Sequence, residues 1–423
     1  MVHLSCESFP SYLRSLQAHS GEEIWQQTVS RHMPHRSKPQ ALVLALWSFG
    51  MVVAQSCGVT SVAAAIAPLV GRKEATVRQQ LREWCDETPR KAGAKRGVKR
   101  AELVVDTCFL PLLRWVLTWW PPTEHRLAFA MDARTLGQRF TVLAISLMYR
   151  GCAIPIAWIV LPATKKGAWR PHWERLFTLI RPGVPSDWTV IVMADRGLYA
   201  KWLYRHIQRM HWHPFLRINV GGNYRPVGLA QFRPLATAVV QGGAGWSGAV
   251  TCFSSANAQL RCTLLARWDD GHTDPWLILT DLAPEQADVA WYGLRPMIEC
   301  GFKDTKRGGW HWEQTKMTDP ARATRLWLAI AVATLWVISV GGHAETTDPA
   351  SMLDVLPESV ARPTPRSRPR LLSCVRRGVI VIITTLIMTG SIPTGRFVPE
   401  PWPTSLDTHP DQPSLAQPLQ DAA

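Results

Sequence analysis

The first 120 residues carry a helical pattern of apolar positions. From residue 39 onward, apolar side chains recur every three or four residues, which is typical of buried or amphipathic helices. Residues 60–69 and 73–84 predict two helices joined by a tight turn. Between residues 72 and 100 there are ten Lys or Arg against four acids. This region predicts either a helix-turn-helix DNA-binding head with a basic arm at residues 90–100, or an ordinary helical hairpin with a solvated face. The basic arm favours phosphate contact.

Short apolar runs replace the helical pattern after residue 121. Runs of this length and composition predict strands, which we expect at residues 127–132, 140–149, 152–161, 188–195, 215–219 and 276–280. The first three are separated by short turns, which indicates an antiparallel meander. Helices expected at residues 172–180 and 198–210 lie between the later strands, as in a mixed α/β sheet.

The rest of the chain divides by composition. Residues 221–271 are rich in Gly, Ser and Thr and predict a β-rich insertion, while residues 284–306 predict one long helix. Residues 362–377 hold six Arg and no acid, which indicates either a phosphate-contacting strip or a solvated hinge. Residues 393–423 are rich in Pro, Asp, Gln and Ser and are expected to be disordered.

These patterns predict three domains. They are a helical N-terminal DNA-binding domain at residues 1–120, an α/β domain at 121–342 with its β-rich insertion at about 220–272, and a C-terminal basic segment and tail at 343–423.

The charge balance narrows the class of partner. The 423 residues carry 47 Lys or Arg against 32 acids, a formal net charge of +15. Such a balance favours a polyanion, either nucleic acid or an anionic membrane surface. Three apolar stretches bear on the membrane alternative, at residues 41–71, 326–342 and 379–393. The last two favour buried core helices, and for 41–71 a membrane span stays open. The N-terminus lacks the pattern of a signal peptide.

One stretch combines unusual side chains. Read as a helix at about 100° per residue, residues 292–306 place Tyr292, Arg295, Glu299 and Lys306 on a single stripe. In one interpretation, Arg295 and Glu299 form an ordinary surface ion pair worth a few tenths of a kcal/mol. In the other, Glu299 holds a metal ion and the two cations hold phosphate.

Two aspartates complete a candidate metal site. Asp132 and Asp195 each end a predicted strand, and such ends are where open α/β sheets build their sites. With Glu299 they offer hard oxygen ligands, which suit Mg²⁺ or Mn²⁺ rather than zinc. Two such ions about 3.5–4 Å apart clamp the attacking and leaving oxygens of a displacement at phosphorus. Either aspartate taken alone is explained as well by a turn cap.

Residues 125–342 resemble the DDE transposases of the insertion-sequence-four family. The most specific part is the family signature of Tyr, two residues, Arg, three residues, Glu, six residues and Lys, which is matched by Tyr292, Arg295, Glu299 and Lys306. Residues 194–199, Ala-Asp-Arg-Gly-Leu-Tyr, resemble the family's Asp-Arg-Gly-x-Tyr segment. Asp132 matches the first acid by strand context and order only.

The resemblance implies a fold and its catalytic residues. The fold is α/β, with a ribonuclease H-like mixed sheet, a β-rich insertion between the second Asp and the Glu, and an all-α N-terminal domain before it. Asp132, Asp195 and Glu299 are implied to be catalytic and to bind two Mg²⁺ ions, for which Mn²⁺ can substitute.

The resemblance also implies DNA contacts. Arg295 and Lys306 hold phosphates near the cut end, and Tyr292 contacts the backbone. Trp276 matches a tryptophan that stacks on a flipped-out base, a contact worth about 1–3 kcal/mol. From the sequence alone, packing of Trp276 on the sheet explains it equally well.

The implied function is cut-and-paste DNA transposition, with metal-dependent hydrolysis at transposon ends and strand transfer into target DNA. We expect a homodimer on double-stranded DNA, because two ends must be cut together, and a cytoplasmic, nucleoid-associated protein without a membrane partner. Two alternatives stay open: a catalytically inactive relic that only binds DNA, and a metal-dependent nuclease without strand transfer. A membrane-associated protein is a third class, motivated by the apolar stretches.

Overall fold

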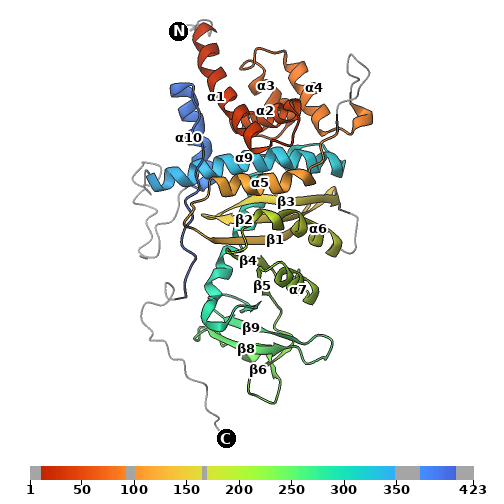
Figure 1. Ribbon diagram of the computed structural model, residues 1–423, viewed down its shortest axis with the longest axis vertical. Helices are drawn as coiled ribbons and strands as arrows, with labels where there is room; N and C mark the ends of the chain where they lie inside the picture. Colours follow the sequence, from red (N-terminus) through yellow and green to blue (C-terminus); the bar gives the residue numbers. More distant parts are fainter. Residues whose placement is uncertain (1–10, 92–100, 164–168, 348–371, 406–423) are drawn as a thin grey trace, which may run out of the picture. The chain divides into compact units, whose positions relative to one another are not determined.

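The computed structural model describes residues 11–91, 101–163, 169–347 and 372–405 (Figure 1). The chain divides into two compact units. Unit 1 comprises Met1–Val192, Arg209–Trp212 and Pro296–Glu400, and unit 2 comprises Met193–Gln208, His213–Arg295 and Pro401–Ala423. The described residues combine helices with ten strands in a mostly antiparallel sheet. The predicted mixed α/β class is confirmed at that level.

Several predicted segments fall wholly or partly outside the described residues. They are most of the basic arm at residues 90–100, the first part of the basic segment at 362–377, and the end of the tail at 393–423.

The helical part of unit 1 is built around α9 (Pro320–Thr347). Every residue of α9 from Arg325 to Gly342 is buried, and the helix packs against α2, α10 and β3. The other helices of this part are α1 (Ser11–His32), α2 (Lys38–Ala54), α3 (Val59–Ile66), α4 (Glu74–Cys85), η1 (Thr88–Arg90), α5 (Asp106–Thr118) and α10 (Cys374–Thr389). The prediction of a buried core helix at residues 326–342 is therefore confirmed.

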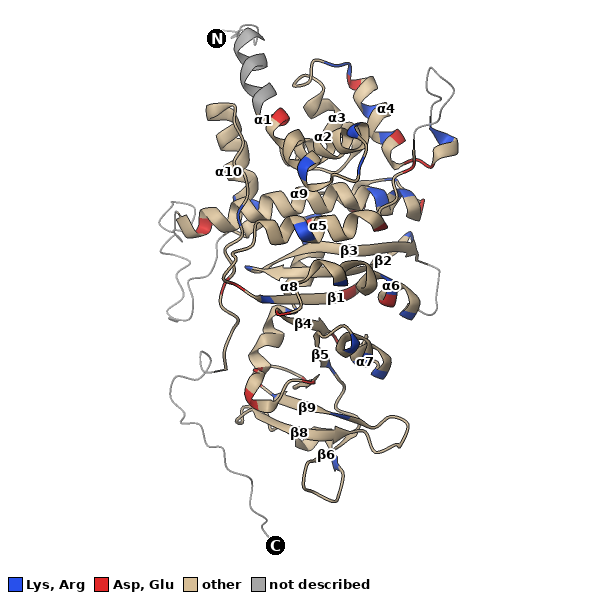
Figure 2. Ribbon diagram, in the orientation of Figure 1, with Lys and Arg blue, Asp and Glu red and all other residues tan. Residues whose placement is uncertain are grey.

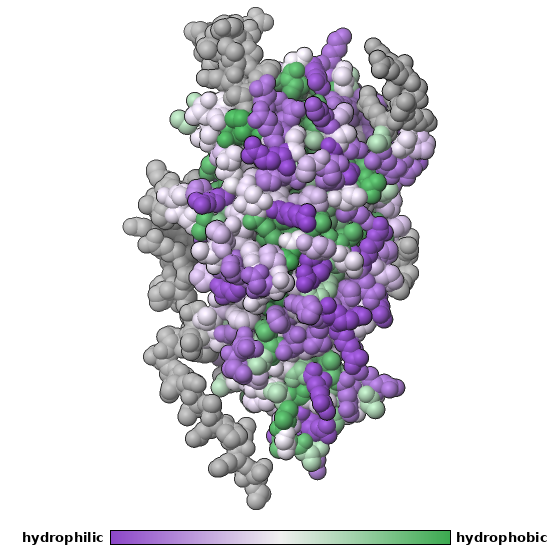
Figure 3. Space-filling model, viewed as in Figure 1, coloured by the Kyte–Doolittle hydropathy of each residue, from purple (hydrophilic) through white to green (hydrophobic). Residues whose placement is uncertain are grey.

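The apolar helices also bear on the membrane alternative. α9 is long and apolar enough to span a membrane, and so are α2 and α3 when taken as one span bent by 91°. An apolar helix whose side chains are buried within its own domain is a core helix, and α9 has this property. The face of the molecule in Figure 3 is a mixture of hydrophilic and hydrophobic residues.

Unit 1 also holds the predicted meander. Its strands are β1 (Arg126–Leu136), β2 (Phe140–Tyr149), β3 (Cys152–Pro162) and most of β4 (Thr189–Ala194), in the order β3-β2-β1-β4. β1, β2 and β3 pair antiparallel, with Asp132 opposite Ala144. All ten residues of β2 are buried, which explains why its apolar run predicted it so directly. Helices α6 (Arg170–Ile180), η2 (Arg181–Gly183), α8 (Met297–Thr305) and η6 (Trp312–Gln314) complete the unit.

The predicted end of the first strand was wrong. The apolar run ends at Asp132, but β1 continues to Leu136 and stays paired with β2. The added residues Arg134 and Thr135 are exposed. A strand that faces solvent in its second half loses the apolar run while keeping its backbone hydrogen bonds, so hydropathy alone cannot detect it.

The strands of unit 2 pair antiparallel with one another. Its elements are α7 (Lys201–Arg209), β5 (His213–Arg217), β6 (Asn223–Pro226), β7 (Arg233–Pro234), η3 (Leu235–Thr237), β8 (Trp246–Cys252), β9 (Leu260–Arg267), β10 (Trp276–Thr280), η4 (Pro284–Gln286) and η5 (Val289–Leu294). Its strand order is β5-β10-β9-β8-β6-β7. Strands β6 to β9 lie in the region predicted to be β-rich.

The prediction of one long helix over residues 284–306 was also wrong. The segment forms the short 3₁₀ helices η4 and η5 and then the nine-residue α8. Pro296 has no N–H to donate to the carbonyl of Tyr292, as an α-helix would require. The N–H of Arg295 donates to that carbonyl instead, at 3.0 Å. The helical stripe from Tyr292 to Lys306 therefore does not exist.

Glycines allow α9 and α10 to approach closely. A Cβ at Gly341 of α9 would overlap the carbonyl of Cys374, and a Cβ at Gly378 of α10 would overlap the carbonyl of Val337. Both obstacles are backbone, so neither can move aside as a side-chain tip could.

We expect Gly341→Ala to lower the free energy of unfolding by about 1–3 kcal/mol or more, because the added methyl forces α10 away from α9. Gly221→Ala is the matched control, since a Cβ there meets no atom within 4 Å. Urea denaturation measures both variants. Equal stability of the two would contradict the close packing of α9 and α10.

Candidate active site

Asp195 directly follows strand β4, at the predicted strand end. The residues of β4 from Val190 to Ala194 are buried, and the chain turns after them. The Asp195 carboxylate accepts a hydrogen bond from the backbone N–H of Arg196 at 2.7 Å. Its side chain is 36% exposed. The carboxylate is therefore held by the turn but remains accessible to a ligand.

Two arginines of unit 2 face this carboxylate. Arg217, the last residue of β5, places Nη1 3.7 Å from Oδ1 of Asp195, and Arg295 places Nη2 3.9 Å from Oδ2. Both guanidinium groups are mostly buried, at 18% and 9% side-chain exposure. These separations are too long for hydrogen bonds but short enough for strong charge–charge attraction. Two guanidinium groups therefore lie within 4 Å of the one carboxylate of Asp195.

Tyr292 and Trp276 pack beside the same turn. Tyr292 is buried, and its hydroxyl donates to the carbonyl of Ala194 at 3.3 Å, one residue before Asp195. The Trp276 ring lies edge-on to the Tyr292 ring, with centroids 5.3 Å apart and an interplanar angle of 74°, an arrangement favoured between aromatic rings. Trp276 is partly exposed. Tyr292 thus supports the backbone that carries Asp195.

Asp132 lies in unit 1, within β1 rather than at its end. Its side chain is half-buried, and one carboxylate oxygen accepts a hydrogen bond from the backbone N–H of Ala133 at 2.8 Å. Directly opposed residues of an antiparallel pair lie on the same face of the sheet, so Asp132 shares a face with Ala144. Residues two apart in a strand also share a face, which adds Arg134.

Helix α8 covers that face of the sheet. Its buried residues Ile298, Phe302 and Thr305 line a small void together with Ala144. α8 contacts β1, β2 and β3. Glu299 follows Ile298 in the first turn of α8 and is exposed. The fold of unit 1 therefore brings Asp132 and Glu299 to the same side of one sheet.

A cavity of about 400 Å³ beside α8 gathers most of the charge on this side. Its lining residues are Arg134, Glu299, Phe302, Lys303, Lys306, Arg307 and Glu313. Lys306 donates from Nζ to the carbonyl of Thr135 at 3.2 Å. Burial, assisted by the charge of Arg134, lowers the pKa of Lys306. Four cations outnumber two carboxylates, so the cavity suits an anion such as phosphate.

The sequence reasoning missed Arg134, Lys303, Arg307 and Arg217. Arg134 follows Asp132 by two residues, and Lys303 follows Glu299 by four, so strand and helix periodicity could have found both. Arg217 is the one charged residue of the predicted strand at residues 215–219 and lies between Leu216 and Ile218, and a cation between apolar residues is a usable signal. Only the fold brings Arg217 to Asp195.

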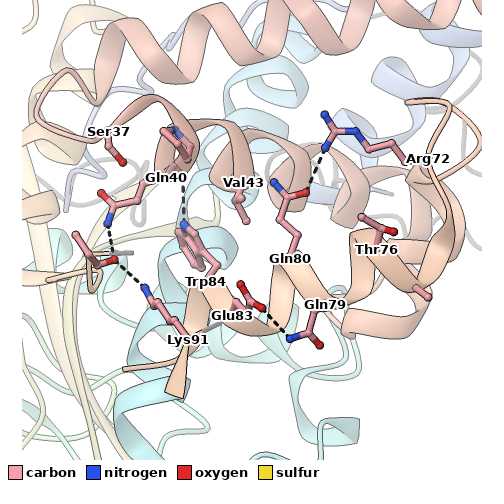
Figure 4. Close-up of a pocket in the computed structure, with 13 residues that line it drawn as sticks. Ser37, Gln40, Val43, Arg72, Thr76, Gln79, Gln80, Glu83, Trp84 and Lys91 are labelled. Atoms are coloured by element: carbon pink, nitrogen blue, oxygen red, sulfur yellow. Dashed lines mark hydrogen bonds between the residues drawn. The ribbon is translucent and has the colours of Figure 1, made fainter. Parts of the chain in front are cut away.

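A second cavity, of about 920 Å³, lies between α2 and α4 in unit 1 (Figure 4). Its polar groups bond to one another. Trp84 donates to the carbonyl of Gln40 at 3.2 Å, Lys91 donates to the carbonyl of Ala101 at 2.8 Å, and Gln79 donates to Glu83 at 2.9 Å.

The chemistry of the three predicted acids fits a hard divalent cation, because all their donor atoms are carboxylate oxygens. All three side chains are at least partly accessible. Asp132 and Glu299 belong to unit 1 and Asp195 belongs to unit 2. Within the described ranges, no three His, Cys, Asp or Glu side chains form a group that could hold a metal ion.

Comparison with known families identifies the region that contains these acids. Residues 132–336 match the family model of the transposase DDE domain. The match begins at Asp132 and includes Asp195, Glu299 and Lys306. It supports a DDE transposase, and with it DNA cleavage and transposition. No curated protein matches the chain.

We expect Tyr292→Phe to lower the free energy of unfolding by about 1 kcal/mol, because it deletes the hydrogen bond to Ala194 while keeping the ring against Trp276. Tyr204→Phe is the matched control, since the buried Tyr204 hydroxyl has no hydrogen-bond partner among the described residues. Chemical denaturation compares the two. If Tyr204→Phe lowered the free energy of unfolding as much as Tyr292→Phe, the stabilising role of the Tyr292 hydrogen bond to Ala194 would be contradicted.

Asp304 of α8 gives unfolding a defined pH dependence. Burial raises the pKa of Asp304 to about 6, against about 4 in an unfolded chain. Folding therefore favours the protonated acid, and stability falls as pH rises from about 4 to about 6, by about 3 kcal/mol in total. Asp304→Asn should remove this fall and be more stable than the wild type at pH 7. Thermal unfolding across this pH range measures it, and an unchanged profile in the variant would exclude Asp304 as its source.

Proposed function

We propose, from the match of residues 132–336 to the transposase DDE domain, that this protein is a cut-and-paste DNA transposase of the insertion-sequence-four type. It binds the two ends of a transposon, hydrolyses phosphodiester bonds there and transfers the freed strand into target DNA. The observation that carries the proposal is the order of acids and cations within the matched region, from Asp132 through Asp195 and Glu299 to Lys306.

Asp132, Asp195 and Glu299 are the residues that would hold the metal ions, two Mg²⁺ with Mn²⁺ as a substitute. When bound, such ions activate a water or hydroxyl nucleophile and stabilise the leaving oxygen of a displacement at phosphorus. The three carboxylates match the ligand preference of these ions.

The cations near each acid hold the DNA backbone. Arg134, Lys303, Lys306 and Arg307 share a cavity with Glu299, and Arg217 and Arg295 face Asp195. Phosphate is a good ligand for guanidinium and ammonium groups. Cations held in this way fix the scissile phosphate and offset its charge, which is the main task of a protein in phosphoryl transfer.

Tyr292 positions the Asp195 turn through Ala194, and the partly exposed Trp276 offers a ring on which an unpaired base can stack. Because two transposon ends are processed together, we propose that the protein acts as a homodimer on double-stranded DNA in the cytoplasm, at the nucleoid. The net charge of +15 suits this partner.

Two related functions compete with this one. An inactive DNA-binding relic is disfavoured because all three acids and the complete signature are present. A metal-dependent nuclease without strand transfer would use the same residues, and only the joining of DNA ends separates it from a transposase.

We expect Asp195→Asn to abolish DNA cleavage and strand joining in Mg²⁺ while leaving DNA binding within a few-fold of the wild type, because the substitution removes a metal-ligand charge and keeps the shape. Asp187→Asn is the matched control, since Asp187 is an exposed acid of unit 1 outside the candidate site. Gel assays of duplexes that carry the flanking inverted repeats measure both steps. Cleavage by Asp195→Asn at the wild-type rate would refute the role of Asp195, and cleavage without joining by the wild type would favour the nuclease.

A further inference from the structure

A third cavity of unit 1, of about 470 Å³, lies apart from the acids. One wall is formed by the turn before α3, the first turn of α3, and Arg82 of α4. The other wall is formed by His311, by residues 314–317 and by Arg322 and Leu326 of α9. Figure 2 shows basic residues on α4 and near the beginning of α9. The cavity thus joins the helical hairpin of the N-terminal region to the segment that follows the signature lysine.

The lining of this cavity is basic. It includes Arg82, Lys316, Arg322 and His311, and none of its described lining residues is Asp or Glu. Arg322 is paired with Asp86 at 3.1 Å, and His311 lies 3.5 Å from Glu313. Arg82 and Lys316 are exposed and have no carboxylate partner in the described part of the chain.

Hydroxyl groups complete the lining. Ser56, Thr60 and Ser61 stand on the wall that also carries Arg82. Hydroxyls and cations together are the usual protein partners of phosphate oxygens. An apolar ligand would leave these cations desolvated without compensation, so the lining selects for an anion.

The wall that carries Lys316 is firmly held. The Arg139 guanidinium, in the turn between β1 and β2, donates to the carbonyls of Glu313 at 2.9 Å, Met317 at 3.1 Å and Thr315. On the opposite side, the backbone N–H of Cys57 donates to the carbonyl of Trp310 at 2.7 Å. The cavity is therefore formed before any ligand binds, which lowers the entropic cost of binding.

The same segment connects this cavity with the one around Glu299. Glu313 lines the cavity of Glu299 and Lys306, while Gln314 and Lys316 line the basic cavity. Three residues span at most about 10–11 Å. A DNA strand carries a phosphate about every 3.4 Å of helix axis, so one strand can occupy both cavities within a few nucleotides.

We propose that this basic cavity binds backbone phosphates of the DNA whose cleaved end lies at Glu299 and Lys306. Arg82 and Lys316 are the principal contacts. The N-terminal helical hairpin and the segment that follows Lys306 therefore bind the same DNA strand. The inference rests on the proposed function, and it locates where unit 1 holds the DNA beyond the cut phosphate.

The test compares binding of a fluorescein-labelled duplex of arbitrary sequence by the full-length wild type and by a double variant, Arg82→Ala with Lys316→Ala. The logarithm of the binding constant is measured by fluorescence anisotropy against the logarithm of salt concentration, between about 50 and 200 mM. Each lost phosphate contact reduces the slope by about 0.9, so we expect a reduction of about two. Arg114→Ala with Arg233→Ala is the matched control, because it removes the same charge from two exposed cations outside the cavity and should leave the slope unchanged.

Three outcomes decide the proposal. The proposal is supported if the salt slope of DNA binding is smaller in the double variant but not in the control. The charge-conserving variant, Arg82→Lys with Lys316→Arg, should then restore the wild-type slope. Equal slopes in wild type, double variant and control overturn it. Inorganic phosphate could also protect the wild type against heat but not the double variant, while the salt slope of DNA binding stays the same in both. That result would assign the cavity to a free anion and would overturn the proposal. These experiments measure DNA binding only. Failure of the proposed function is recognised in a different assay, as a wild type that neither cuts nor joins DNA.

Discussion

The missing N–H of Pro296 decides how the signature segment folds. An α-helix through this point would need a donor to the Tyr292 carbonyl, and proline cannot supply one. The 3₁₀ helix η5 ends at Leu294, and a new helix begins at Met297, after the proline. Tyr292 and Arg295 belong with Asp195 to unit 2, whereas Glu299 and Lys306 belong with Asp132 to unit 1. A single signature in the sequence thus contributes to two local structures.

Each of these structures surrounds a carboxylate with more positive than negative charge. Two guanidinium groups face Asp195, and four cations share a cavity with Glu299. Arg217 and Arg295 are mostly buried, and burying charge costs free energy, whereas Arg134, Lys303 and Arg307 are exposed. The surplus is explained if a polyanion supplies the balancing charge, which is what a DNA backbone does.

How far the sequence predicts this structure depends on what fixes each element. Strands β2 and β3 and helix α9 are buried almost throughout, so their apolar runs alone identified them. The second half of β1 is held by pairing with β2 but faces solvent. The pattern of hydropathy therefore does not predict that part of the strand. The prediction of one helix over residues 284–306 was wrong because it relied on helical periodicity and did not take Pro296 into account. Among the site residues, Asp132, Asp195 and Glu299 came from spacing and type, whereas Arg217 reaches Asp195 only through the pairing of distant segments, which no local pattern encodes.

Glu299 and Lys306 show how a correct grouping can have a different cause from the predicted one. Helical periodicity placed them on one stripe, and they do line one cavity. Yet α8 ends at Thr305, and Lys306 leaves the helix with ψ of −133°. Its ammonium group reaches the carbonyl of Thr135 on β1, which brings it over the sheet beside Arg134. The contact with β1, and not the helix, therefore sets the position of the lysine. It follows that the length of β1 beyond Asp132, which hydropathy did not predict, is what brings the signature lysine to the face of the sheet that the first acid and the glutamate share.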